Sequence, residues 1–399
     1  MRKQEVDYII TRMLDAYGNV SDLNITVGKP FQVESSGQLA AVEMEPHFKE
    51  LTPFQTEIFT LNLINKNRRL TETLLREGSC DLSYILPGKA RFRVNIFSQR
   101  GMYSSVLRKL ETKIPTIQDL KLPNAFRKIA QERNGIVFVT GATGSGKTTS
   151  LAAVLNAVNE SKTVHVITLE DPVEYSHPHK KCTFNQRELG KDFDTFAHGL
   201  RAALRQAPKI ILVGEMRDRE TVEIGLAAAE TGHLVLATLH TVDAPESINR
   251  IISVFPPHQH RQIRAQLSGI IKAVISQRLV PRADGKGRVP AVEVMVSTAR
   301  TRDLIDDREK TKLLRDAIQQ GFVSYGMQTF DQSLMHLYKK QLISFEEALR
   351  QSSNPDDFKL KASGISSTSD LSWEDFERPH EAAKQEEEAE SPSEVNDLE

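Results

Sequence analysis

The chain has 399 residues, enough for two or three domains, and its 52 basic side chains nearly balance its 53 acidic ones. The balance is uneven, because residues 366–399 hold twelve acidic and two basic residues and leave about nine net positive charges on residues 1–365. This modest positive charge suits an anionic nucleotide but falls short of a nucleic-acid-binding surface, so we expect no nucleic-acid partner.

The cysteines and the hydropathy pattern restrict the cellular setting. Cys80 and Cys182 stand alone without a C-x-x-C spacing, which argues against structural zinc and fits a reducing compartment. No apolar run approaches membrane-spanning length, and the opening MRKQEVDYII lacks the apolar core of a signal peptide. We therefore expect a cytoplasmic protein without direct membrane insertion, which another protein would hold at any membrane where it works.

Residues 1–115 predict a small α+β domain. A first helix covers residues 3–17, and a second begins at Pro53, directly after Thr52, with Leu70 still on its apolar side. Short apolar runs separated by turn residues predict strands at 23–27, 31–34, 38–42, 80–86, 91–98 and 104–110. The domain ends near Ile114-Pro115.

Residues 116–365 alternate strands with helices, which is typical of a parallel α/β sheet. The predicted strands are 136–139, 163–169, 209–213 and 233–239, and polar residues follow each of them. Ligands of open α/β folds bind beyond these strand ends. From Pro256 onward the pattern predicts mostly helix, at 258–280, 299–320 and 328–350. Residues 366–399 are acidic and lack periodicity, so we expect a disordered tail.

A phosphate-binding loop is the most specific motif of the chain. Residues 141–148 (GATGSGKT) fit G-x-x-x-x-G-K-[ST] and stand between a buried strand and a helix over 151–158. Glycines let successive backbone N–H groups turn toward a phosphate, and the helix adds its positive dipole end. Lys147 can reach the β- and γ-phosphates, and the Thr148 hydroxyl can bind Mg²⁺. The expected ATP-binding residues are Gly141, Thr143, Gly144, Ser145, Gly146, Lys147, Thr148 and Thr149.

Two acidic clusters follow buried strands in this predicted nucleotide-binding domain. Residues 170–174 (EDPVE) follow one strand, and residues 215–218 (EMRD) follow another. One carboxylate can hold the Mg²⁺ shell while another orients or deprotonates the attacking water. We assign Glu215 to the metal and Glu170 to the water. The alternative interpretation, helix caps or surface ion pairs, suits Asp171 and Asp218.

Two histidines stand at opposite ends of the strand over 233–239. His240 emerges at the same edge as Lys147, Glu170 and Glu215, so it can contact the γ-phosphate or be structural. His233, at the other end, favours packing. Neither histidine has a spacing that indicates metal ligation.

Four segments in this order resemble the secretion-type ATPases of type IV pili and type II secretion. They are GATGSGKTT, ITLEDPVEY, ILVGEMRDRET and AAAETGHLVLATLHT, the family's Walker A, Asp box, Walker B and His box. YGMQTFDQSL and LISFEEAL resemble the pilus retraction branch, PilT and PilU. The resemblance implies a PAS-like N-terminal domain, a RecA-like ATPase domain and a homohexamer. It also implies a cytoplasmic retraction motor for twitching motility, peripheral at the inner membrane, that acts on a PilC-like platform protein.

The same resemblance implies catalytic arginines in the small domain. In such rings arginines of this domain face the phosphates, and the matching positions here are Arg93 and Arg108, with Arg91 as a weaker match. Two departures from the family pattern occur: Ala207 and Lys209 stand where aspartates are common before Walker B, and Asn24 replaces a histidine. The extension ATPases resemble the chain less well, because they carry an extra N-terminal domain and usually a tetracysteine zinc module.

Three alternative functions remain open at this point. An accessory, PilU-like motor working beside a paralogous retraction ATPase is hard to separate from a primary motor by sequence. A RecA-like nucleic-acid translocase would need more basic charge and interleaved aromatic residues. A nucleotide sensor that does not hydrolyse ATP would have a damaged Walker motif, and all its parts are present here.

Overall fold

The computed structural model describes residues 2–45, 48–110 and 113–364, and the predicted acidic tail lies outside these ranges. The described chain divides into two compact units. One consists of the residues up to Ile114 together with Asp171–His177, and the other of Pro115–Glu170 and the residues from Pro178 onward. Among the described residues, no helix has the combined length and hydrophobicity that crossing a membrane requires.

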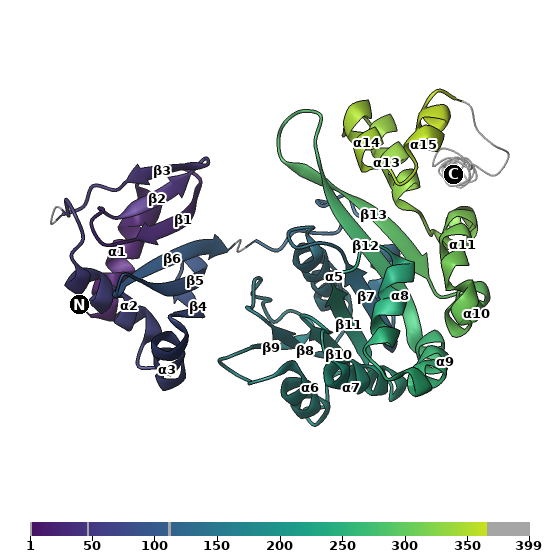
Figure 1. Ribbon diagram of the computed structural model, residues 1–399, viewed down its shortest axis with the longest axis horizontal. Coiled ribbons are helices and arrows are strands. Elements are labelled where there is room, and N and C mark those ends of the chain that lie inside the picture. Colours follow the sequence, from purple (N-terminus) through teal and green to yellow (C-terminus); the bar gives the residue numbers. More distant parts are fainter. Residues whose placement is uncertain (1, 46–47, 111–112, 365–399) are drawn as a thin grey trace, which may run out of the picture. The chain divides into compact units, whose positions relative to one another are not determined.

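The first unit is built on a six-stranded antiparallel sheet in the order β3-β2-β1-β6-β5-β4 (Figure 1). Along β5, Phe92, Val94 and Ile96 are fully buried and alternate with more exposed residues, as a half-buried strand requires. Its elements are α1 (Lys3–Asp15), β1 (Val20–Ile25), β2 (Gln32–Ser35), β3 (Gln38–Ala41), α2 (Pro53–Ile64), α3 (Arg68–Glu77), β4 (Ser79–Leu86), β5 (Ala90–Gln99) and β6 (Met102–Leu110).

The helix expected to run from Pro53 to Leu70 is two helices. Thr52 caps the start of α2, and its side chain accepts a hydrogen bond from Gln55 N–H. The helix ends at Asn65, whose φ of 49° is left-handed, and Asn67 then caps α3. The sequence prediction missed this stop because the apolar spacing continues through it.

The second unit contains a seven-stranded sheet in the order β13-β12-β7-β11-β10-β8-β9. All strand pairs are parallel except β12–β13, which is antiparallel, so the predicted parallel α/β sheet is confirmed. Every residue of β7, β10 and β11 is buried. The strands are β7 (Gly135–Thr140), β8 (His165–Glu170), β9 (Thr183–Glu188), β10 (Ile210–Val213), β11 (Leu234–Leu239), β12 (Ile271–Pro281) and β13 (Arg288–Val296).

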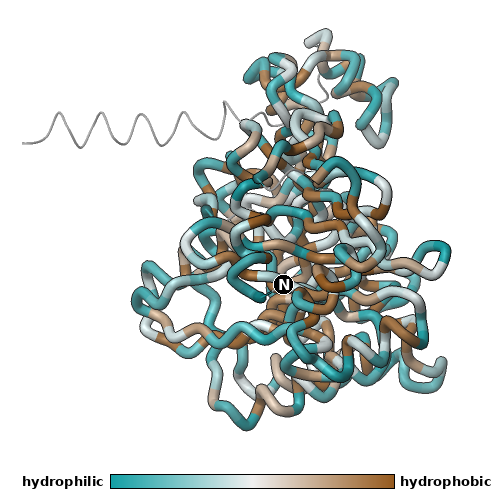
Figure 2. Tube along the Cα trace, turned by 90° about the vertical axis from the view of Figure 1, so that its left-hand side faces the viewer, coloured by the Kyte–Doolittle hydropathy of each residue, from teal (hydrophilic) through white to brown (hydrophobic). Residues whose placement is uncertain are grey.

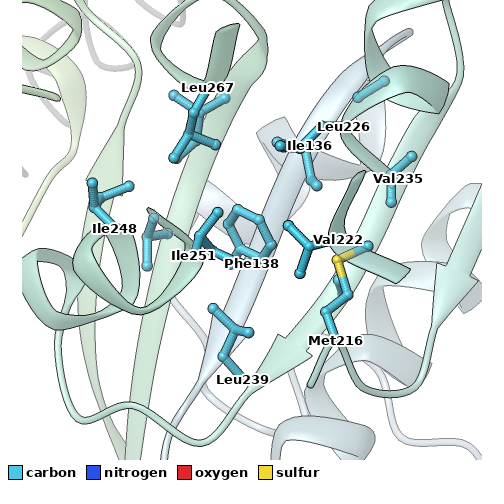
Figure 3. Packing of buried hydrophobic residues seen from close by; sticks show 14 of the residues in the cluster. Ile136, Phe138, Met216, Val222, Leu226, Val235, Leu239, Ile248, Ile251 and Leu267 are labelled. Atoms are coloured by element: carbon cyan, nitrogen blue, oxygen red, sulfur yellow. The ribbon is translucent and has the colours of Figure 1, made fainter. Parts of the chain in front are cut away.

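Helices cover both faces of this sheet. Ile136 and Phe138 pack on the face covered by α6–α9 (Figure 3), and Val137 and Val139 pack toward α4 and α5. Hydrophobic stretches of the chain lie mostly toward the interior, while the loops at the margins are mostly hydrophilic (Figure 2). The helices are α4 (Ala125–Gln131), α5 (Lys147–Ser161), α6 (Phe196–Leu204), α7 (Arg219–Glu230), α8 (Ala244–Ser253), α9 (His260–Ile270), α10 (Ala299–Asp306), α11 (Leu314–Gln320), α12 (Phe322–Tyr325), α13 (Phe330–Lys339), α14 (Phe345–Gln351) and α15 (Pro355–Ala362).

The helix predicted over 258–280 is wrong in its second half. Helix α9 ends at Ile270, and the chain continues directly as strand β12 between β7 and β13. A strand buried on both faces has a nearly continuous apolar run, which periodicity alone does not separate from a helix. Strand β9 was also missed, because this edge strand carries mostly polar side chains.

The last helices form a small core of their own against the outer ends of β12 and β13. Phe330, Leu334 and Leu337 of α13 pack with Val280 of β12 and Phe358 of α15. The Arg278 guanidinium stacks 4.0 Å from the centroid of the Phe330 ring, and its Nη1 donates to Gln351 O at 3.0 Å. Strand β12 therefore connects the sheet to the C-terminal helices.

Candidate functional site

The loop between β7 and α5 has backbone geometry that requires glycine. Gly141, Gly144 and Gly146 have φ values of 142°, 77° and 88°. A Cβ on Gly141 would lie 2.4 Å from Gln277 O, and a Cβ on Gly146 would lie 2.7 Å from Gln277 Nε2. The loop therefore lies against β12 with no space for side chains at these two positions.

Lys147 begins α5, and its side chain folds back over the loop. Its Nζ donates to Gly141 O at 2.8 Å and to Ala142 O at 3.0 Å, and the residue is largely buried. The Ser145 hydroxyl is buried and has no hydrogen-bond partner among the described residues. The Ser145 hydroxyl, the Lys147 ammonium and the N-terminus of α5 are groups that fit a polyphosphate, and Thr148 lies at the same helix start.

Gln277 braces this loop and was not predicted. Its Nε2 donates to Ser145 O at 2.8 Å, and its Oε1 accepts from the Ser150 hydroxyl of α5 at 2.8 Å. The side chain is 2% exposed, so both bonds form away from water. A polar pair, Ser276-Gln277, inside an apolar run was the available signal, but the run was interpreted as a helix.

Glu170 is the last residue of β8, and a hydroxyl and an amide group hold one of its carboxylate oxygens. Oε1 accepts from Thr168 Oγ1 at 2.5 Å and from Gln186 Nε2 of β9 at 3.1 Å. The residue is only 6% exposed. A carboxylate whose direction is fixed in this way can hold a water molecule in one orientation.

Glu215 follows β10 and lies beside Arg217 and His240. His240 Nε2 is 3.2 Å from Glu215 Oε1, and the Arg217 guanidinium pairs with the same oxygen. The Thr238 hydroxyl donates to Gly214 O, which ties the ends of β10 and β11 together. His240 and Glu215 therefore lie in direct contact. The carboxylate of Glu215 is a chemical group that can also bind a metal ion.

Parallel pairing brings the predicted residues of the second unit to one edge of the sheet. Val213 pairs with Leu169 and Ala237, and Leu239 pairs with Thr140, so β7, β8, β10 and β11 end side by side. Lys147, Glu170, Glu215 and His240 all follow or close these strand ends. Among the described residues, no group of three His, Cys, Asp or Glu side chains forms a metal site by itself.

Asp218 and His233 have the structural roles that the sequence offered as alternatives to a role in the site. Asp218 caps α7, and its carboxylate accepts from Thr221 N–H at 2.8 Å and from the Thr221 hydroxyl at 2.7 Å. His233 Nδ1 lies 3.0 Å from Ala228 O, at the opposite end of β11 from His240. Both residues therefore have local structural roles.

Arg93 and Arg108 are cross-strand neighbours in the first unit. They pair in the register of β5 and β6, and both side chains are at least half exposed. Arg108 Nε donates to Oδ1 of the buried Asp22 at 2.8 Å, while Arg93 Nε lies 3.9 Å from Asp81 Oδ1. The antiparallel register thus places two positive charges side by side, and the ion pair with Asp22 restrains the side chain of Arg108.

Comparison with known proteins places the chain in a family. The model of the family described as "Type II/IV secretion system protein" matches residues 81–350. Pseudomonas aeruginosa "Type IV pilus ATPase PilU" is 41% identical over 89% of this chain and 91% of its own length. The P. aeruginosa "Type IV pilus retractation ATPase PilT" is also 41% identical, over 88% and 99%. The chain belongs to the type IV pilus retraction ATPases.

A solved structure supports the same assignment. The "Pilus Retraction Motor PilT and Bound ADP" superposes with a TM-score of 0.79 and 40% sequence identity, over 88% of this chain and 98% of that one. The resemblance to the PilT/PilU branch, the fold class and the ATPase class are therefore confirmed. The roles of individual site residues remain predictions.

The brace formed by Gln277 can be tested by substitution. Gln277→Ala removes two buried hydrogen bonds of about 1 kcal/mol each, so we expect affinity for ADP to fall by up to roughly 30-fold. Isothermal titration calorimetry measures this loss. Gln131→Ala, at an exposed position on α4, is the matched control and should bind as the wild type does. Equal affinity for both variants would mean that Gln277 does not support the loop.

Proposed function

We propose that this protein is a Mg²⁺-dependent ATPase that hydrolyses ATP to ADP and phosphate, as a homohexamer, to power type IV pilus retraction and twitching motility. The observation that carries the proposal is the 41% identity to PilU and PilT over nearly nine tenths of the chain. The sheet edge with Lys147, Glu170, Glu215 and His240 supports it, since these side chain types serve phosphoryl transfer.

Each residue at the sheet edge has a defined part in the proposed reaction. Lys147 would exchange its two loop carbonyl acceptors for phosphate oxygens of ATP, while the loop N–H groups hold the β-phosphate. Mg²⁺, held by Thr148 and Glu215, would neutralise charge on the phosphates. Glu170 would accept a proton from the attacking water, and His240 would contact the γ-phosphate from its position against Glu215.

Arg93 and Arg108 would complete the site in the assembled ring. Charge spreads over the transferred phosphoryl group in the transition state, and an inserted arginine stabilises it. Two exposed, adjacent guanidinium groups on one strand pair suit this task. In this proposal Asp22 is a positioning residue, because its ion pair restrains Arg108.

The proposed setting is the cytoplasmic side of the inner membrane, where a PilC-like platform protein would receive the mechanical work. A second candidate, the accessory motor acting beside a paralogous retraction ATPase, is supported by the equal identity to PilU and PilT. Both candidates require the same ATPase chemistry and differ in the partner that each needs.

Complementation with an inactive variant tests the proposed function. Lys147→Ala removes the positive charge that would contact the γ-phosphate, so we expect kcat to fall about 100-fold or more. In a strain lacking this gene, the wild type should restore pilus retraction and Lys147→Ala should not. Lys286→Ala, in the β12–β13 turn, is the control. Restoration by Lys147→Ala would exclude a motor driven by this site, and a need for the paralogue would identify the accessory role.

The two carboxylates should fail in different ways. Glu170→Gln should bind Mg-ATP normally and hydrolyse it about 10²–10³-fold more slowly, because the proton acceptor is lost. Glu215→Gln should raise the Mg²⁺ concentration needed for half-maximal rate, because a metal ligand loses its charge. Magnesium titrations of ATPase rate distinguish them. Wild-type turnover by Glu170→Gln would transfer the role of base to another residue.

Hydrolysis should depend on the ring and on its arginines. Arg93→Ala and Arg108→Ala should bind ATP and assemble normally but lose roughly 10³-fold in kcat, because the transition-state charge is unneutralised. Arg68→Ala, in an exposed ion pair of the same unit, is the control. Wild-type activity per subunit should rise with protein concentration as rings form, in parallel with mass measured by light scattering. A flat concentration profile with active arginine variants would contradict completion of the site by the ring.

A further inference from the structure

A buried carboxyl group lies beside the site but belongs to none of its motifs. Glu293 is on β13 and is 4% exposed. Its Oε1 accepts from Ala244 N–H at 2.9 Å and from the Ser276 hydroxyl at 3.4 Å. Burying a carboxyl group costs free energy unless the group is hydrogen-bonded. These two hydrogen bonds offset that cost, and they join Glu293 to two neighbouring elements, α8 and β12.

One contact leads to the P-loop strand. Thr140, Ser276 and Glu293 are register partners across β7, β12 and β13, so they form one row on the sheet. The Thr140 hydroxyl donates to Ser276 Oγ at 3.1 Å, and Ser276 donates onward to Glu293. Thr140 is the residue directly before Gly141, so the row ends where the phosphate-binding loop begins.

The other contact leads to the His240 segment. Ala244 is the first residue of α8, and its N–H is one of the amides that a helix cannot satisfy internally. Only three residues separate it from His240, which lies against Glu215. Within this segment, the Thr241 and Ser247 hydroxyls are 2.6 Å apart and fold the connection onto α8. Glu293 thus holds the base of the segment that ends in His240.

We propose that Glu293 is a positioning residue for ATP hydrolysis, whose carboxylate holds the start of α8, and with it His240, in register with the P-loop strand. This inference rests on the proposed function. Removing the carboxylate would leave the substrate-binding loop in place and loosen the γ-phosphate contact, so it affects turnover more than binding.

The protonation of Glu293 changes near neutral pH. Burial raises the pKa of Glu293 from 4.5 to about 7, and Asp243 also raises it, while the Ala244 N–H, Arg315 and Ser276 lower it. Arg315 is itself paired with Asp331 at 3.4 Å. Above pH 7 the ionised carboxylate accepts a stronger hydrogen bond from Ala244 N–H than the neutral acid does. The positioning therefore tightens as the pH rises through about 7.

The stability of the folded state changes with pH in the opposite direction to the proposed positioning by Glu293. Because the pKa of Glu293 is raised on folding, the folded protein binds more protons than the unfolded chain between pH 4.5 and about 7. The contribution of Glu293 to stability is complete below pH 4.5 and is lost as the pH rises through about 7. Activity and stability should thus respond to the same proton in opposite directions, which a purely structural role would not produce.

Glu293→Gln provides the test, because the amide keeps the shape and the acceptor but does not titrate. Steady-state kcat and KM of the full-length protein are measured from pH 5.5 to 8.5, with the exposed Glu346→Gln as control. At pH 8 we expect kcat of Glu293→Gln to be about five- to tenfold below wild type with KM within about twofold, and the two rates to converge at pH 6. The two proteins differ only at residue 293, so a difference between the shapes of their pH profiles arises from Glu293.

Two further measurements keep the outcomes separable. The Tm of Glu293→Gln should exceed that of the wild type by a margin that widens from pH 5 to 8. Hydrogen exchange at pH 8, without nucleotide, should be faster in residues 240–247 of Glu293→Gln and of Ser276→Ala than in the control. Parallel pH profiles, or unchanged exchange in both variants, would overturn the proposal. A wild type without ATPase activity would overturn the proposed function, and the exchange data would still decide whether Glu293 positions α8.

Discussion

The burial of β7 on both faces is the constraint on which the site depends. Helices α4 and α5 cover one face of this strand and α6–α9 cover the other, so its end is fixed inside the protein. The chain that leaves it must satisfy its polar backbone locally, and Lys147 does this by bonding to the carbonyls of Gly141 and Ala142. In the proposed function, phosphate oxygens would replace these two carbonyl acceptors of Lys147, and a loop already held in shape loses little conformational freedom on binding.

The two carboxylates at the sheet edge occupy different electrostatic settings. Glu170 meets a hydroxyl and an amide, which give its oxygen a direction. Glu215 meets the guanidinium of Arg217 and the ring of His240 at the same oxygen. The sequence places both residues after buried strands and does not distinguish them. These contacts are consistent with the roles that the proposed function gives to the two residues, although each role awaits its own substitution.

The sequence predicts a site residue where the evidence for it lies within one strand and the residues that directly follow. The P-loop, Glu170, Glu215 and His240 each follow an apolar run, and parallel pairing alone brings such strand ends together. The roles of Gln277 and Glu293 could not be predicted in this way. Both depend on β12 lying between β7 and β13, and the helical interpretation of residues 271–280 removed that strand from the sheet. The pairing of Arg93 with Arg108 similarly depends on the β5–β6 register, although the family resemblance had already selected both residues.

Strand β12 carries three neighbouring side chains with three different partners. Ser276 bonds to Thr140, Gln277 braces the P-loop, and Arg278 stacks on Phe330 of α13. The pairing of β12 with β7 is irregular between Ile271 and Ala273 and regular from Ala273 onward. Side chains alternate between faces, so deleting one residue within 274–275 would exchange a hydroxyl, an amide and a guanidinium among sites that each fit only one of them. The exposed β12–β13 turn, near Asp284, is free of this constraint, which applies to the regularly paired part of β12 from Ala273 onward. The P-loop and the C-terminal helices are therefore held by adjacent residues of one strand, Gln277 and Arg278, and their spacing cannot change without changing that strand.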